Sequence, residues 1–245
     1  MKRIICVVSG KGGVGKTVVT CNLGLALTEL VGEVTVVDAD LSVSNLGIQL
    51  GSYEPVIGLQ EVLRGEVDVD DSISFHRSGL KFIPSSISNE RRFTYKPYRL
   101  KNVLKDLNGI VLIDAPPGLG DDVFSALNSC SEVIVVTNPE IPAVTDAMKI
   151  VKFAKDMKKE VLGIVVNRRR SRFELKDDEI EDLCEAHVIA NIPEDHHLRK
   201  SIHEKTPIVQ YKPFSSSSLE FKRLAANLAG IKYKQPRFAR LRMLF

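Results

Sequence analysis

The residues with the clearest chemical meaning form a glycine-rich run early in the chain, Gly-Lys-Gly-Gly-Val-Gly-Lys-Thr. This run fits the motif G-x-x-x-x-G-K-[ST] and directly follows an apolar segment, the context in which the motif binds phosphates. Glycines let backbone N–H groups approach an anion closely, and a helix that begins there adds its unpaired amino-terminal donors. We therefore expect a nucleotide-binding loop made by Gly10, Lys11, Gly12, Gly13, Val14, Gly15, Lys16 and Thr17.

Two side chains of this loop contribute chemistry of their own. Lys16 can place a cation on the β- and γ-phosphates, and the Thr17 hydroxyl is a hard oxygen ligand suited to Mg²⁺. The loop thus predicts a nucleoside triphosphate and Mg²⁺ as its ligands. The alternative is an accidental glycine-rich turn before a helix, and the complete motif in its context argues against it.

Carboxylates follow two further apolar segments. Asp114 comes directly after residues 110–113, and Asp38 and Asp40 follow residues 34–37. An acid after a strand often caps a turn or a helix, but two such segments beside a phosphate loop favour a metal site. We expect Asp114 to orient a water on Mg²⁺. Residues i and i+2 of an extended segment point the same way, so Asp38 fits the metal shell and Asp40 the attacking water.

The elements that must position these residues alternate along the chain. Short apolar runs rich in β-branched residues alternate with longer helical patterns, which predicts an α/β fold with a mostly parallel central sheet and helices on both faces. Strands are expected at Arg3–Val8, Val34–Val37, Lys81–Ile83, Ile110–Ile113, Val133–Val136 and Val161–Val166. Helices are expected at Thr17–Leu30, Leu59–Arg64, Tyr98–Leu107, Asp121–Ser129, Pro142–Met157, Asp177–Cys184, Asp195–Glu204 and Ser218–Leu228.

The composition is that of an ordinary globular protein, with 245 residues, 44% hydrophobic and 27% charged. This argues against a disordered, collagenous or disulfide-scaffold chain. The net charge is only +3, but residues 221–245 hold seven basic residues and no acidic one. We expect a single P-loop domain over residues 1–230, followed by a basic amphipathic tail over residues 231–245.

Other potential metal or membrane signals are weak. The four cysteines form no CxxC pair, so we expect them to be buried or half-buried in a reducing, cytoplasmic compartment. Adjacent residues point apart on a helix, so His196 and His197 are not expected to hold a metal. No apolar run approaches the ~20 residues that a spanning helix requires.

In order along the chain, the motifs resemble those of the MinD/ParA family of deviant Walker A P-loop ATPases, and most closely its archaeal and bacterial MinD-type members. The matching residues cover roughly 1–230 and include Lys11 within the loop, Val37–Asp40, Asn45-Leu46, Asp114–Gly118, Val166–Arg168 and Ile192–Asp195. The resemblance implies an ATP-dependent homodimer in which two subunits sandwich two ATP molecules. Lys11 maps onto the family's signature lysine and would reach the partner's phosphates, stabilising charge there as an arginine finger does. Lys11, Lys16 and Asp40 would then be the catalytic residues.

The same resemblance implies where the base binds. Asn167 matches the family's adenine-reading asparagine, and an amide can both accept from an exocyclic amine and donate to a ring nitrogen. The backbone of Ile192, Pro193, Glu194 and Asp195 would form the other wall. A turn-forming asparagine is the alternative for Asn167. The sequence lacks an Asn-Lys-x-Asp motif, which favours ATP over GTP. Val18 and Val19 stand where relatives often carry further threonines, and we expect this to change helix packing only.

The tail suggests a partner. Phe238, Leu241 and Phe245 fall on one face of a helix, and Arg240 and Arg242 flank them, so an anionic membrane could order the segment. A frayed or folded-back tail is the alternative. The leading hypothesis is a MinD-type ATPase that dimerises on ATP, attaches reversibly to the inner face of the cell membrane and positions the division site or other machinery. An activator or cargo protein is expected as a further partner.

Two other functions stay open. A second basic cluster follows Asn167, at residues 168–172, and arginine clusters neutralise nucleic-acid phosphates without reading bases. A DNA-partitioning ATPase of the ParA kind is therefore one alternative, although solvated loop arginines are the simplest interpretation of the cluster. The other alternative is a nucleotide-gated adaptor, in which ATP binding matters and hydrolysis is negligible.

Overall fold

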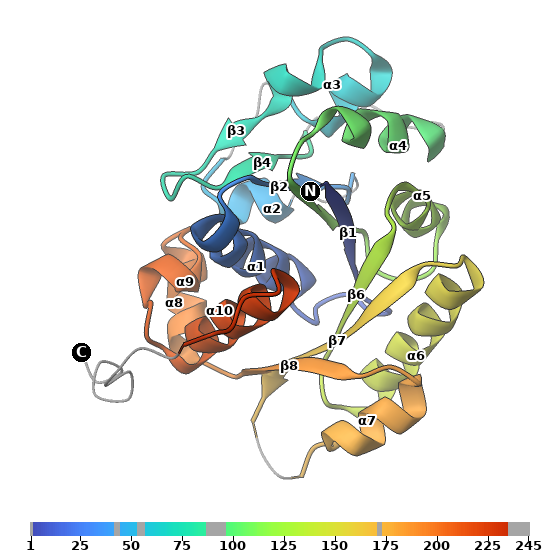
Figure 1. Cartoon of the computed structure of the whole chain (residues 1–245), viewed down its shortest axis with the longest axis vertical. Coiled ribbons are helices and arrows are strands. Elements are labelled where there is room, and N and C mark those ends of the chain that lie inside the picture. The colour runs from blue at the N-terminus through green and yellow to red at the C-terminus, as the bar shows by residue number, and fades with distance from the viewer. Residues whose placement is uncertain (1, 42–44, 53–56, 87–96, 171–172, 235–245) are drawn as a thin grey trace.

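The computed structural model describes residues 2–41, 45–52, 57–86, 97–170 and 173–234, and its elements are labelled in Figure 1. Within these ranges one eight-stranded sheet has the order β3-β4-β2-β5-β1-β6-β7-β8. All neighbouring strands are parallel except β3 and β4, which are antiparallel. The strands are β1 Arg3–Val8, β2 Val34–Asp38, β3 Ser74–Phe75, β4 Lys81–Ile83, β5 Ile110–Asp114, β6 Glu132–Thr137, β7 Glu160–Arg169 and β8 Val188–Pro193.

Helices cover both faces of this sheet (Figure 1). One face carries α1 (Lys16–Val31), α2 (Asn45–Gln49), α8 (His196–His203), α9 (Ile208–Tyr211) and α10 (Ser216–Leu228). The opposite face carries α3 (Leu59–Arg64), α4 (Pro97–Asp106), α5 (Asp121–Ser129), α6 (Ile141–Asp156) and α7 (Asp177–Cys184), with a 3₁₀ turn at Val69–Ser72. Among the described helices, none is long and apolar enough to cross a membrane.

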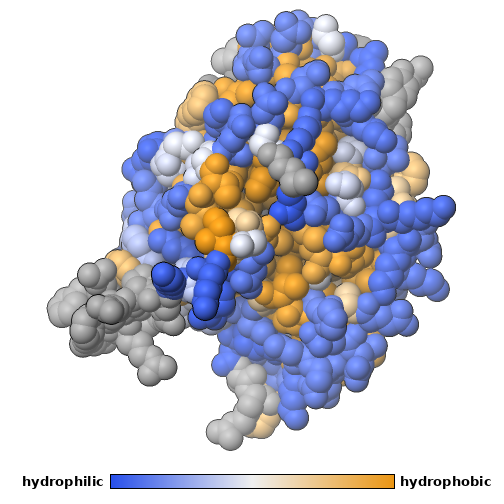
Figure 2. Space-filling model, in the orientation of Figure 1, coloured by the Kyte–Doolittle hydropathy of each residue, from blue (hydrophilic) through white to orange (hydrophobic). Residues whose placement is uncertain are grey.

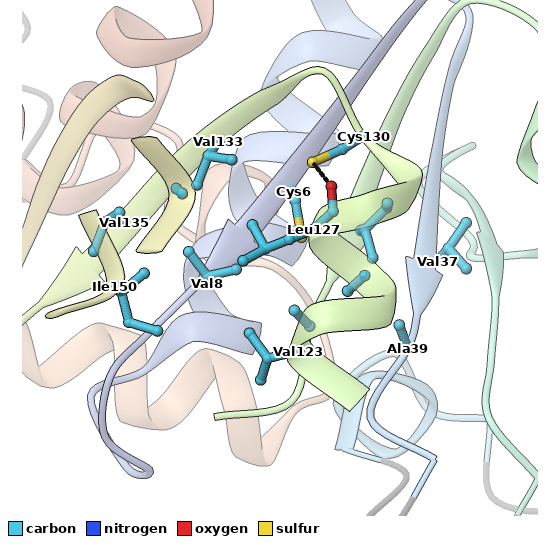
Figure 3. Close-up of a cluster of buried hydrophobic side chains, with 14 of the residues drawn as sticks. Cys6, Val8, Val37, Ala39, Val123, Leu127, Cys130, Val133, Val135 and Ile150 are labelled. Carbon is cyan, nitrogen blue, oxygen red and sulfur yellow. Dashed lines mark hydrogen bonds between the residues drawn. The ribbon is translucent and has the colours of Figure 1, made fainter. Parts of the chain in front are cut away.

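The core follows directly from the side-chain alternation of the central strands. In β1, Ile5 and Val7 pack into the cluster beneath α1, whereas Cys6 and Val8 pack into the cluster beneath α5. Figure 3 shows the second cluster, where Cys6 and Val8 lie against Val123 and Leu127 of α5. On the face seen in Figure 2, apolar residues are visible toward the middle of the view and hydrophilic ones surround them. Strands buried on both faces read as continuous apolar runs, which is why β1, β2 and β5 are recognisable from sequence.

The predicted fold class is confirmed, and each predicted strand and helix is present. Their ends lie within one or two residues of expectation, except that β7 continues to Arg169. The predictions omitted β3, β8, α2, α9 and the 3₁₀ turn, which are short or lie at the edges of the sheet. All four cysteines are free and buried, as expected. Residues 235–245, which hold most of the expected tail, lie outside the described residues, so the division at residue 230 stays a prediction.

Candidate nucleotide-binding site

The predicted phosphate loop connects β1 to α1 at the carboxyl edge of the parallel strands, where ligands of open α/β sheets bind. It lines a pocket of about 360 Å³, which we call the phosphate pocket. Most of the predicted loop residues contribute to it, together with residues from three other segments. The lining consists of Ser9, Gly12, Gly13, Val14, Gly15, Lys16, Thr17, Val18, Asp40, Asn45, Gln49, Pro117 and Arg168.

Two loop glycines are required by geometry. Gly15 has a φ of +91°, and a Cβ at this position would lie 2.3 Å from the Asn167 Nδ2. Gly10 lies outside the pocket lining, but a Cβ there would lie 2.3 Å from the carbonyl oxygen of Asp146 on α6. The loop is therefore packed between Asn167 on one side and α6 on the other. This close packing holds its backbone N–H groups in a fixed arrangement at the start of α1, where helix donors are unpaired.

The structure brings Lys16 and Asp114 together in a buried ion pair. The Lys16 Nζ lies 2.6 Å from the Asp114 Oδ1, and the two side chains are only 7% and 1% exposed. The Thr20 hydroxyl donates a 3.1 Å hydrogen bond to the same carboxylate oxygen. Removing one partner of such a pair leaves an uncompensated charge. A phosphate that drew Lys16 away would leave Asp114 without its cation, and a metal ion bound there would replace it.

Asp38 lies directly beside Asp114, as its register partner across β2 and β5. It is fully buried and accepts hydrogen bonds from the Ser85 hydroxyl (3.1 Å) and the Leu46 N–H (3.3 Å). Burial, reinforced by the negative charge of Asp114, raises the pKa of Asp38 to about 8. Asp38 is thus mostly protonated at neutral pH, whereas Asp114 is paired with a lysine. A bound divalent cation would favour the ionised form of Asp38.

The residues present fit a magnesium ion. Thr17, Asp38 and Asp114 together offer a hydroxyl and two carboxylates, the hard oxygen donors that Mg²⁺ prefers. Thr17 lines the phosphate pocket, and the two carboxylates lie at the ends of adjacent strands behind it. A buried, protonated Asp38 next to Asp114 is the arrangement expected of a site that binds a cation in exchange for a proton.

Asp40 and Asp38 occupy different surroundings. Asp40 lines the phosphate pocket beside Asn45 and Gln49, whereas Asp38 does not reach the lining. The Asp40 N–H donates to the Asp38 Oδ1 over 3.2 Å, so the chain turns between the two residues. The strand pattern predicted that the two side chains point the same way, but only Asp40 lines the phosphate pocket. An acid at the pocket wall can orient a water, which is the task predicted for Asp40.

Asn167 lies in a second pocket of about 140 Å³, adjacent to the first, which we call the base pocket. Its Nδ2 donates a 2.7 Å hydrogen bond to the Val14 carbonyl, and its buried Oδ1 has no partner among the described residues. The predicted base-reading amide therefore binds the phosphate loop through an N–H of its Nδ2. Its Oδ1 stays available to accept a hydrogen bond from an exocyclic amine. The lining comprises Gly15, Val18, Asn167, Arg168, Glu194, Asp195, Leu198, Arg199 and Ile202.

The predicted second wall of the base pocket needs a correction. Glu194 lines this pocket, but Ile192 and Pro193 do not. Ile192 is fully buried as part of β8, where its side chain packs beneath α1 and α10. The last two residues of the expected range, Glu194 and Asp195, line the pocket, and residues of α8 complete the wall.

The remaining predicted loop residue, Lys11, is exposed and does not line either pocket. Val18, by contrast, lines both pockets, so the expectation that Val18 and Val19 affect helix packing only is wrong for Val18, whereas Val19 is fully buried in the core. Gln49 and Arg168 also line the phosphate pocket without having been assigned there. Their positions depend on how α2 and the end of β7 fold over the loop, and no local motif encodes that.

The adjacent histidines also differ from expectation. The rings of His196 and His197 do not point apart, because their centroids are 3.8 Å from each other. With Asp195 they bring ligand-type atoms within 4.8 Å of one another. The Asp195 carboxylate, however, already caps α8 by accepting from the His197 N–H (2.9 Å) and accepts from the Ser217 hydroxyl (2.7 Å). Burial opposes ionisation, but these hydrogen bonds hold the pKa of Asp195 below its usual value.

A glycine-rich phosphate loop between a buried strand and a helix, with acids at the ends of neighbouring parallel strands, defines a P-loop nucleotide-binding protein of the α/β class. Residues 5–208 match the family model of the CobQ/CobB/MinD/ParA nucleotide binding domain. The chain therefore belongs to this family, and the resemblance found in its motifs is confirmed.

Known proteins of the family resemble this chain over nearly its whole length. An uncharacterized ATP-binding protein of Methanocaldococcus jannaschii is 38% identical over 238 residues, which are 96% of this chain and 90% of the relative. The septum site-determining protein MinD of Pyrococcus horikoshii, solved in complex with Mg-ADP, is 39% identical with a TM-score of 0.88, over 96% of this chain and 100% of that one. The MinC:MinD cell division protein complex of Aquifex aeolicus matches with 26% identity and a TM-score of 0.85, over 96% and 98% of the two chains.

Proposed function

We propose that this protein is a MinD-type ATPase, which binds ATP with Mg²⁺, hydrolyses it to ADP and phosphate, and uses the two nucleotide states as a switch. The observation that carries the proposal is the convergence of the phosphate loop, Lys16 and Asp40 on one pocket, with Asn167 in the pocket beside it. The Mg-ADP bound to the Pyrococcus horikoshii relative supports the choice of ligand.

Each residue then has a defined task. The loop N–H groups and Lys16 bind the β- and γ-phosphates, and Lys16 leaves Asp114 to do so. Thr17, Asp38 and Asp114 would hold Mg²⁺, which supplies neutralisation of the phosphate charge. Asp40 orients the attacking water from the pocket wall. The unpartnered Oδ1 of Asn167 accepts from the adenine amine, which a guanine base, with a carbonyl at that position, does not offer.

The switch requires a second copy of the chain. Lys11, the second residue of the phosphate loop, is exposed and makes no ion pair or hydrogen bond within the described ranges. Such a lysine is available to the phosphates of a facing subunit, as the family resemblance implies. A cation that arrives in trans stabilises charge on the transferring phosphoryl group. We therefore propose an ATP-dependent homodimer with Lys11 as its trans-acting residue.

The cellular role follows as a further part of the proposal. The dimer attaches reversibly to the inner face of the cell membrane through residues 231–245 and regulates division-site placement or positions other machinery. Septum site-determining and cell division proteins among the relatives support this role. The Aquifex aeolicus relative forms a complex with MinC, which supports the expectation of a protein partner here.

Hydrolysis is tested with Asp40→Ala. We expect its ATP turnover to fall well below that of the parent while Mg-ADP affinity stays within about threefold, because Asp40 acts on the water and not on the β-phosphate. Asp70→Ala is the matched control, since Asp70 is an exposed acid on the 3₁₀ turn and should leave turnover unchanged. Equal, near-zero turnover in parent and variant would favour the nucleotide-gated adaptor.

Membrane attachment is tested by sedimentation with anionic liposomes in the presence of ATP. The full chain should pellet, and a chain that ends at Gly230 should not. Binding retained after truncation would remove the membrane proposal. Salt-sensitive DNA retention that is unaffected by truncation would favour the ParA-like partitioning ATPase, because phosphate contacts weaken steeply with salt.

A further inference from the structure

Three consecutive arginines follow Asn167, and two of them have structural roles. Arg169 pairs with Asp177 and donates to the Asn191 Oδ1 over 3.1 Å, which ties the end of β7 to α7 and β8. Arg170 pairs with Glu194 over 3.3 Å. Arg168 makes no hydrogen bond or ion pair with any part of the chain that the structure describes, and its side chain is exposed. Of the three cluster arginines that the structure describes, Arg168 alone has no such partner.

The backbone at Arg168 is unusual. Its φ is +59°, a left-handed conformation that costs a residue with a Cβ about 1–2 kcal/mol. The register of β7 against β8 shifts between Asn167 and Arg169, so Arg168 is the extra residue of a bulge. Bulges redirect a side chain away from the regular alternation of the strand. Strained backbone of this kind gathers at ligand sites, where the strain is part of how a side chain is aimed.

The bulge aims Arg168 at the boundary between the two pockets. Among the described residues, only Gly15, Val18 and Arg168 line both the phosphate pocket and the base pocket. Gly15 has no side chain and Val18 is apolar, so Arg168 is the one charged group that these two linings share. A nucleotide with its base on Asn167 and its terminal phosphates on the loop must cross this boundary with its ribose and α-phosphate.

We propose that Arg168 is a nucleotide-binding residue whose guanidinium contacts the α-phosphate and ribose of the bound nucleotide. This inference rests on the proposed function and adds a specificity element to it. ATP and ADP share the α-phosphate, so a contact to that group selects phosphorylated nucleosides over unphosphorylated ones. A guanidinium suits the task, since its planar fork donates two parallel hydrogen bonds to a phosphate. Asn167 and Arg168 thus read adjacent parts of the ligand from adjacent positions of the chain.

The test compares Arg168→Gln and Arg168→Gly with the parent, using competition against a fluorescent ADP analogue in Mg²⁺ at low and high salt. Both variants should lose about tenfold in ADP affinity, and the affinity that remains should depend less on salt than in the parent, because a phosphate–cation contact is screened. Arg168→Lys should recover part of the loss. Arg223→Gln is the matched control, because Arg223 is an exposed arginine of α10 that pairs with Glu220 and lines neither pocket, and its ADP affinity should stay within about twofold of the parent.

The Arg168→Gly variant distinguishes a contact between the side chain and the nucleotide from a role of Arg168 in the backbone structure. Glycine adopts a positive φ freely, so this variant should unfold at the same temperature as the parent or a higher one while it loses ADP affinity. Affinity within twofold of the parent in both variants would overturn the inference. A loss in Arg168→Gln that Arg168→Gly restores would also overturn it, because the role would then be structural. A parent that binds no ADP at all would instead refute the proposed function.

Discussion

The buried carboxyl of Asp38 predicts a specific pH dependence of folding stability. Its pKa is about 8 in the folded chain, against an ordinary value of 3.8, because it is buried next to Asp114. Between roughly pH 4 and pH 8 the folded state therefore carries a proton that the unfolded state has lost. Stability must fall as pH rises through this range, since the unfolded state binds fewer protons. The slope from this one group is about 1.4 kcal/mol per pH unit, so about 3 kcal/mol between pH 5 and pH 7.

The perturbation is Asp38→Asn, which keeps a neutral, hydrogen-bonding side chain in the same place. Other groups also titrate, so the informative quantity is the difference between variant and parent. Urea unfolding of the nucleotide-free chain at several pH values should show the stability of the Asp38→Asn variant rising relative to the parent by about 3 kcal/mol from pH 5 to pH 7. A constant difference across this range would refute the reasoning, because it would place the folded pKa of Asp38 near its ordinary value.

Three further predictions concern the same site. Gly15→Ala should abolish nucleotide binding in a fluorescence titration, because the added Cβ would lie 2.3 Å from the Asn167 Nδ2 at a φ of +91°; binding within threefold of the parent would contradict this. Asp114→Asn should lower unfolding free energy by about 3–5 kcal/mol, since it leaves Lys16 buried and unpaired. A Lys16→Met, Asp114→Asn double variant should recover part of that loss, and strict additivity would argue against the ion pair. Ser217→Ala removes a 2.7 Å hydrogen bond to Asp195 and should cost about 2 kcal/mol in urea unfolding while ADP affinity changes less than threefold.

The parts of the site that the sequence predicts are those encoded locally. The phosphate loop is a continuous motif, and Asp40 and Asp114 each follow a strand whose apolar run is unmistakable because helices bury both of its faces. The central strands and the long helices are found for the same reason. Asn167 was placed by the family resemblance, at the end of the strand expected over Val161–Val166, and that strand, β7, continues to Arg169.

The parts that escape prediction depend on tertiary packing. β8 reads Val-Ile-Ala-Asn-Ile-Pro and lies at the edge of the sheet, where polar residues and a terminal proline are tolerated and weaken the strand signal. The prediction therefore placed the base-pocket wall at Ile192–Asp195 and missed the contribution of α8. Arg168 differs from its neighbours only through a bulge, and a run of three arginines carries no sign of which one is redirected. His196 and His197 lie in the first turn of α8, directly after its Asp195 cap, and a simple helical projection did not predict that their rings converge.

The central claim is that ATP and Mg²⁺ hold two copies of this chain together. The most direct measurement is the solution mass of the full chain by light scattering, with a saturating non-hydrolysable ATP analogue and Mg²⁺ or with Mg-ADP. We predict a mass twice that of one chain with the analogue, a single-chain mass with ADP, and loss of the dimer in Lys11→Ala. A single-chain mass with the analogue demonstrably bound would contradict the account.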